Sequence, residues 1–142
     1  MAALYCTASA ANVSLTSGSA SFALVGTTPS NHRIRLQVVK TLLKGVAAVD
    51  LLARLVEVTG TISGGTTITP VKTPNVGSET IQTTFVSAPS GLTAGNVLSL
   101  LYLQAGNAES LDLAIPGGTK FALELTPTGA SPTVGVEFKF EE

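Results

Sequence analysis

Regular alternation of apolar and polar residues is the feature that most constrains the fold of this chain. It is clearest in Ser110–Ile115, Lys120–Leu125 and Thr133–Phe140, where most alternate positions hold a large aliphatic or aromatic residue. Two clusters rich in Gly and Pro, Pro116–Gly118 and Thr128–Pro132, separate these segments. A period of two residues is typical of a strand with one buried face. We therefore expect three consecutive antiparallel strands, each with one apolar and one solvent-facing side.

Further strands are expected upstream. Thr80–Ser87 is rich in β-branched residues, and Val97–Gln104 is a nearly continuous apolar run. The residues between them, Ala88–Gly95, are dense in turn formers and predict a loop. Nearer the N-terminus, Ser19–Val25 is a strand candidate. Alternation restarts at His32–Leu36, and it places Ile34, Leu36 and Val38 on one face.

The segment Leu36–Val58 fits two alternatives. Its apolar residues are dense enough to satisfy helical as well as strand spacing, and Lys40, Lys44 and Glu57 are good helix formers. Gly45 and the β-branched residues around it favour two strands joined by a loop. Two strands also agree better with the strands expected in the rest of the chain. A helix is the alternative prediction for this segment.

Short strands separated by Gly and Pro predict an all-β protein, an antiparallel β-sandwich of jelly-roll type. Length supports a single core, because 142 residues is close to the commonest domain size. Ser and Thr make up roughly a quarter of the chain, a composition suited to strands and turns. We expect residues 1–18 to form an N-terminal arm or an edge strand and residues 19–142 to form the jelly-roll domain.

Charge and composition argue against several function classes. A net charge of -1 leaves no basic excess for nucleic acid. No run of about 18 apolar residues predicts a membrane span, and Met1–Ala11 lacks the basic and apolar regions of a secretory signal. One cysteine, Cys6, and one histidine, His32, rule out an internal disulfide and the common zinc sites.

His32 is the residue that a catalytic reading would need as its base. It follows the turn Pro29–Asn31, and Ser30 and Asn31 are its neighbours in sequence. Adjacency in the chain does not create the geometry of a triad, and no Gly-x-Ser-x-Gly elbow occurs. We expect His32 to be bonded to the backbone of the turn, and we expect no catalytic residue, cofactor site or metal site.

Carboxylates offer a second possible site. Facing strands could bring Asp112, Glu124 and Glu137 together as calcium ligands. The same polar faces carry Lys120 and Lys139, and cross-strand pairing with these lysines is the favoured prediction. Two other carboxylates that could contribute to a paired site are Asp50 and Glu57.

Two Gly pairs and the cysteine have structural explanations. Gly64-Gly65 and Gly117-Gly118 lack the context of a phosphate-binding loop, so we expect turns with positive φ. Cys6 is predicted to be a small buried residue in an N-terminal strand.

Four segments of the chain follow one another in a characteristic order: Asn31–Ile34 at a strand start, Gly64–Lys72, the turn Ile115–Gly118, and the ending Val136–Glu142. Their order resembles a family of small jelly-roll virion proteins of tailed bacteriophages, the capsid decoration or cement proteins. The resemblance covers most of the chain from about Ser19 onward. Absence of tryptophan and the apolar stretch Val46–Leu55 depart from the family pattern, and Met1–Gly18 has no counterpart in it.

This resemblance implies a structural role without catalysis. It implies a homo-oligomer, with a trimer as the expected state, that binds the lattice of the phage major capsid protein. The expected location is the capsid surface of the virion, after synthesis in the host cytoplasm. Residues 1–18 would then be an arm that docks on a neighbouring subunit.

An alternative is a carbohydrate- or receptor-binding jelly-roll module on a head fibre or tail. Sugar sites usually expose aromatic rings. Here only Tyr5, Tyr102 and five phenylalanines are available, and most of them lie on the apolar side of an expected strand, which faces the core. The decoration role is therefore favoured.

Overall fold

The computed structural model describes residues 4–44, 50–72, 80–101 and 108–142. These residues form eleven strands and no helix, which confirms the all-β prediction. The strands are β1 (Tyr5–Ser14), β2 (Ser21–Thr27), β3 (Ile34–Lys44), β4 (Asp50–Ser63), β5 (Thr66–Ile68), β6 (Val71–Lys72), β7 (Thr84–Ser87), β8 (Ser90–Leu101), β9 (Ala108–Ile115), β10 (Lys120–Thr128) and β11 (Thr133–Glu141).

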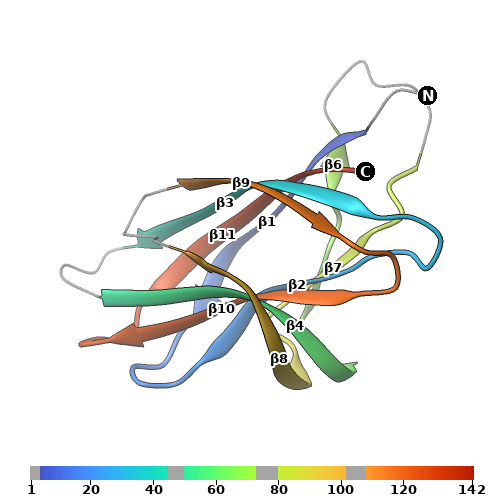
Figure 1. Ribbon diagram of the computed structural model, residues 1–142. Helices are drawn as coiled ribbons and strands as arrows, with labels where there is room; N and C mark the ends of the chain where they lie inside the picture. The colour runs from blue at the N-terminus through green and yellow to red at the C-terminus, as the bar shows by residue number, and fades with distance from the viewer. Residues whose placement is uncertain (1–3, 45–49, 73–79, 102–107) are drawn as a thin grey trace.

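Two antiparallel sheets face each other and form a β-sandwich (Figure 1). Sheet A has the order β6-β1-β11-β3-β9, and sheet B has the order β5-β7-β2-β10-β4-β8. The eight long strands pair in a nested way: β1 with β11, β2 with β10, β3 with β9, and β4 with β8. Successive pairs alternate between the sheets, as in one long hairpin wound around a core.

Phenylalanines fill the space between the sheets. Phe85 and Phe121 come from sheet B, and Phe138 and Phe140 from sheet A. All four are fully buried, and rings from opposite sheets are in contact. The ring centroids of Phe85 and Phe140 lie 5.1 Å apart, and those of Phe121 and Phe138 lie 5.7 Å apart. Such pairs add about 0.5–1.5 kcal/mol to the free energy gained from burial alone. The aromatic residues therefore hold the two layers together.

A second, smaller apolar cluster lies on the outer face of sheet B. It contains Val25, Val56, Val58 and Ala122, all buried. Half-buried residues from the far ends of the β4–β8 pair, Ile62 and Leu92, pack against it. The ends of β4 and β8 therefore bend over the outer face of the sheet, and the bend is visible at the lower front of Figure 1.

Glycine makes this bend possible and explains a wrong prediction. Ala88–Gly95 was expected to be a loop, but β8 begins at Ser90. Gly60 and Gly91 approach closely, and both have positive φ, +108° and +83°. A Cβ on Gly91 would lie 2.5 Å from the carbonyl oxygen of Thr61. Glycines inside a strand can mark a bulge or a close backbone approach, as they do here.

The three C-terminal strands exist, but their expected arrangement is wrong. β9 and β11 belong to sheet A, whereas β10 lies in sheet B between β2 and β4. The expected solvent-facing side of β10 is also wrong, because Ala122 and Glu124 are buried. The bent ends of β4 and β8 cover Ala122, and Arg54 pairs with the Glu124 carboxylate.

Two local expectations also fail. The pairing of β3 with β11 shifts between Leu36 and Val38, so Val39 is buried opposite Phe138 and Val38 leaves the predicted face. Of the predicted strand Thr80–Ser87, only Thr84–Ser87 is a strand. In the preceding residues, the N–H groups of Gln82 and Thr83 donate to a carboxylate instead. Residues 102–104 of the strand expected at Val97–Gln104 lie outside the described residues.

The segment Leu36–Val58 forms strands in its described part, β3 and β4. The connection expected at Gly45–Ala48 lies outside the described residues. In the N-terminal segment 1–18, β1 pairs with β11 along most of its length and with β6 at only two positions. Leu4, Cys6 and Ala8 are buried in the main core of the same chain.

Candidate functional site

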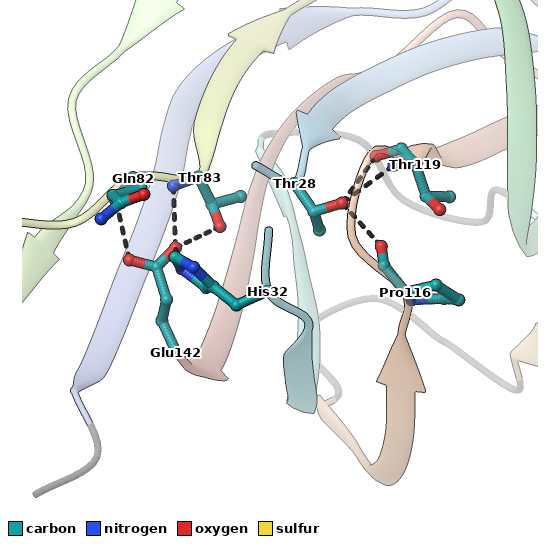
Figure 2. A network of polar contacts seen from close by, with 7 residues as sticks. All are labelled: Thr28, His32, Gln82, Thr83, Pro116, Thr119 and Glu142. Atoms are coloured by element: carbon teal, nitrogen blue, oxygen red, sulfur yellow. Dashed lines mark hydrogen bonds and ion pairs between the residues drawn. The ribbon is translucent and has the colours of Figure 1, made fainter. Parts of the chain in front are cut away.

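His32 faces the side chain of Glu142 (Figure 2). Its Nε2 lies 3.9 Å from Oε1 of Glu142, whose side chain is only 3% exposed. The backbone N–H groups of Gln82 and Thr83 donate to the Glu142 carboxylate at 2.7 and 2.8 Å, and the Thr83 hydroxyl also donates to it. The sequence placed the partner of His32 in the turn, whereas the structure places a carboxylate from the other end of the chain beside it.

The order of groups in this network differs from that of a catalytic triad. In a triad, the imidazole lies between the hydroxyl nucleophile and the carboxylate. Here the carboxylate of Glu142 lies between the Thr83 hydroxyl and the His32 imidazole (Figure 2). Backbone hydrogen bonds further link the chain ends, because Leu4 and Glu142 donate to each other's carbonyl oxygens. We interpret the network as structural: it holds the C-terminal end of β11 against the residues before β7.

A second network closes the turn between β9 and β10. The buried hydroxyl of Thr28 donates to the carbonyl oxygen of Pro116 at 2.7 Å and accepts from the N–H of Thr119 at 2.9 Å. Figure 2 shows Thr28 inserted into this turn. As predicted, the turn contains a glycine with positive φ, Gly118 at +71°. The other predicted turn, Gly64-Gly65, has φ values of +65° and +76°.

The carboxylates considered as calcium ligands are not brought together. Asp112 lies on β9 and Glu137 on β11, both in sheet A, whereas Glu124 lies on β10 in sheet B. Within the described part of the chain, no three His, Cys, Asp or Glu residues are grouped as metal ligands would be.

Arginines pair with two of these carboxylates, where lysines were expected. Arg35 donates to Asp112 at 2.6 Å on the surface of sheet A. Arg54 donates to Glu124 through Nε at 2.8 Å and through a terminal nitrogen at 2.5 Å. Lys120 instead donates to the carbonyl oxygen of Gly60. The planar guanidinium favours such close pairing with a carboxylate.

Cys6 lies in β1 and is buried, as predicted. Burial raises the pKa of its thiol from 9.0 to about 11, Glu142 adds to the rise, and Lys72 opposes it. A thiol with a raised pKa is a poor nucleophile at neutral pH. Cys6 is therefore part of the core.

Among the described residues, the outer face of sheet A carries polar side chains and has a depression near its centre. The depression has a volume of about 340 Å³ and lies over β1, β3 and β11. Lys40 and Glu137 are opposite each other in the β3–β11 register, and Leu42 is opposite Gly135. Leu42 is half-exposed beside this glycine. This face offers both charges and an apolar side chain to a binding partner.

The opposite sheet presents an apolar surface at its β8 edge. Leu52 and Leu100 are each 57% exposed, and Val97 is 45% exposed. In the register of sheet B, Leu100 is opposite Arg54, and Arg54 is opposite Glu124. The exposed leucines thus lie next to an ion pair that is already formed. Large exposed aliphatic groups gathered at one place indicate a binding surface.

Aromatic residues contribute little to the described surface. Four of the five phenylalanines are buried in the core, and Phe22 is half-buried. Tyr5 is about half-exposed, and Tyr102 lies outside the described residues.

Comparison with protein-family models, with curated proteins and with solved structures finds no match to this chain. Among the residues that the structure describes, no helix is long and apolar enough to span a membrane.

Sequence reasoning missed Glu142 and Arg54. Both act through partners that are far away along the chain, Gln82–Thr83 and Glu124 respectively. The β4–β10 register places Arg54 opposite Glu124. The contact of Glu142 with Gln82 and Thr83 is made by residues just outside β11 and β7. One signal was present: Glu124 and Arg54 each sit at a polar position of a strand that is otherwise strongly apolar.

Proposed function

We propose that this chain is a structural virion protein of a tailed bacteriophage. It decorates and stabilises the capsid by binding the lattice of the major capsid protein, without catalysis. It acts as a homo-oligomer, with a trimer as the expected state. Its place is the capsid surface, after synthesis in the host cytoplasm.

The strand order supports the jelly-roll assignment on which this proposal draws. A jelly roll has eight strands in two sheets. The eight long strands here form four nested antiparallel pairs that alternate between sheets A and B. This arrangement buries both ends of the described chain in one core, because Leu4 and Phe140 belong to the same cluster. A protein that reinforces a shell benefits from such a closed, rigid unit.

The exposure of large apolar side chains on a well-packed sandwich is the observation that carries the proposal. A cluster of buried residues fills the space between the sheets, and other large apolar side chains project from both sheets. Solvated apolar groups favour binding, because removing them from water contributes a free energy of roughly 25 cal/mol per Å² of apolar surface. The exposed residues are Tyr5, Leu42, Leu52, Val71, Val97 and Leu100.

The outer face of sheet A is the surface that we assign to the shell. Its depression combines Leu42 with the opposite charges of Lys40 and Glu137. Interfaces between different proteins commonly combine an apolar centre with a polar rim. Each contact with the shell needs only modest affinity, because an oligomer that makes several contacts at once binds more strongly than a single copy.

Co-sedimentation with assembled shells that lack the protein tests the proposal. The unmodified chain should pellet with the shells at saturating, regularly spaced sites. Leu42→Glu should reduce binding by about tenfold or more, because it replaces the apolar centre with a charge. Thr61→Glu, an exposed position at the far end of β4, is the matched control and should bind normally.

Two results would count against the proposal. One is failure of the unmodified protein to bind the shells. The other is unchanged stability of virions from which the protein has been deleted. A clear hit on a glycan array would instead favour the carbohydrate- or receptor-binding alternative.

A further inference from the structure

In the part of the chain that the structure describes, the two sheets have four edge strands, and only one of these is long and uncharged. β5 and β6 contain three and two residues. β9 is longer but carries Glu109 and Asp112. β8 has twelve residues, and none of them is charged. Natural proteins usually protect an edge strand by making it short or by placing charges on it.

An apolar surface surrounds the β8 edge. On its outer side it exposes Leu52, Val97 and Leu100. On its inner side, half-buried Leu98 from β8 and Leu111 from β9 pack against the main core. We call these five residues the β8 surface. In Figure 1, β8 lies at the front of the molecule, with no other labelled strand in front of it.

Arg54 and Glu57 are charged residues of β4 that lie beside β8, and both have hydrogen-bond partners within the chain. The Glu57 carboxylate accepts a hydrogen bond from the Asn96 side chain of β8 at 3.4 Å. Arg54 is opposite Leu100, and its guanidinium already donates twice to Glu124. Breaking a buried ion pair is strongly unfavourable, whereas burying an intact pair keeps its hydrogen bonds. The part of the surface around Leu100 and Arg54 can therefore be dehydrated without a charged partner on the other molecule.

We propose that the β8 surface binds a second copy of this chain. Near the symmetry axis of a homo-oligomer, each side chain meets its own counterpart, so any charge there would face a like charge. The twelve residues of β8 themselves bring no charge to such a contact. A partner with a different sequence could carry charges opposite to charges on this edge, so such an edge would not need to be uncharged. The absence of charge on β8 therefore favours a second copy of this chain as the partner. The inference rests on the homo-oligomer in the proposed function and identifies its contact surface.

Light scattering after size-exclusion chromatography tests this inference. The unmodified chain should have a mass that is a multiple of 14.4 kDa, with threefold as the expected value. Val97→Lys and Leu100→Lys should each raise the dissociation constant of the oligomer at least about tenfold, because like charges would then meet at the contact. Val71→Lys is the control, since Val71 is 67% exposed on β6, at the opposite edge. Circular dichroism should be the same for all three variants.

Hydrogen exchange on the unmodified protein removes any dependence on how the variants fold. The amides of Val97–Leu101 should exchange slowly at high concentration and faster after dilution, whereas those of the central strand β10 should not change. A monomer at all concentrations, an oligomer that survives both lysine substitutions, or β8 exchange independent of concentration would each overturn the inference.

The outcomes separate this inference from the proposed function. A monomer that still binds shells refutes the β8 contact and leaves the decoration role intact. An oligomer that dissociates with Leu100→Lys but never binds shells supports the β8 contact and refutes the decoration role. Loss of shell binding by a Leu100→Lys variant of a monomeric protein would show that this surface binds the capsid instead, which also overturns the inference.

Discussion

Thr28 and Thr41 are both buried, but their hydroxyl groups have opposite environments. The Thr28 hydroxyl donates to one backbone group and accepts from another. The Thr41 hydroxyl is buried and has no hydrogen-bond partner among the residues that the structure describes. A buried polar group without a partner costs about 1–3 kcal/mol, whereas a satisfied one stabilises the fold.

The same substitution should therefore act in opposite directions at these two positions. Thr41→Val should raise the free energy of unfolding by about 1 kcal/mol, because a methyl group replaces the unpaired hydroxyl. Thr28→Val should lower it by about 1–3 kcal/mol, because it leaves the Pro116 carbonyl and the Thr119 amide unpaired. Urea denaturation of the three proteins measures both effects. A loss of stability in Thr41→Val would contradict our description of the core.

The thiol of Cys6 should be unreactive in the folded protein. Its pKa of about 11 means that little thiolate exists at pH 8, and the side chain is buried. A chromogenic disulfide reagent should label Cys6 only after denaturation. Rapid labelling of the native protein would show that β1 opens readily.

The same pKa predicts how stability changes at alkaline pH. In the unfolded chain the thiol ionises near its ordinary value of 9.0, whereas in the folded protein it holds its proton to about pH 11. The unfolded state therefore binds fewer protons in this range, and stability falls as pH rises from about 9 to 11. Cys6→Ala should show a smaller decline over this range in thermal unfolding followed by circular dichroism. Equal declines in both proteins would rule out Cys6 as the cause.

Among the elements, the β4–β8 pair depends most on a particular backbone shape. Gly91 has positive φ, and its α-carbon faces the Thr61 carbonyl oxygen. Gly91→Ala should reduce the free energy of unfolding by about 2–4 kcal/mol, because it adds both backbone strain and a steric clash. Gly18→Ala is the matched control. Its φ is +77° but no atom lies within 4 Å of the added carbon, so about 1 kcal/mol is expected. Equal losses in the two variants would mean that the close approach is unimportant.

Strands were predictable where alternation is local, and sheet membership was not. The periodic residues in Thr133–Phe140 give β11 almost at its observed bounds. Alternation carries no information on which sheet a strand joins, so β10 was expected beside β9 and β11 but lies in the other sheet. The first half of β8 was predicted as a loop because Ala88–Gly95 is rich in turn-forming residues. The sequence alone does not distinguish a glycine that allows a bend inside a strand from a glycine in a loop.

The candidate surfaces were less predictable than the strands. Leu100 and Leu123 both belong to apolar strand segments, yet one is exposed and the other is fully buried. Exposure depends on position in the sheet, since β8 is at the edge and β10 in the interior. Glu142 could not be assigned either, because its donors come from Gln82 and Thr83, which the sequence placed in a strand.

At the scale of the whole molecule, the sandwich offers two distinct surfaces for two distinct contacts. The outer face of sheet A has opposite charges around Leu42, and it is the surface proposed for the shell. The β8 edge of sheet B is apolar and uncharged along its strand, and it is proposed for contact between copies. Low total charge suits both roles, because closely spaced copies repel each other less.

Imaging of capsids by electron microscopy, with and without the added protein, tests the central claim most directly. The decoration role predicts density for a two-layered sandwich at regular lattice positions on the outer surface, with sheet A toward the shell and the β8 edges of neighbouring copies in contact. Shells that look the same with and without saturating protein, or density confined to the tail, would contradict it.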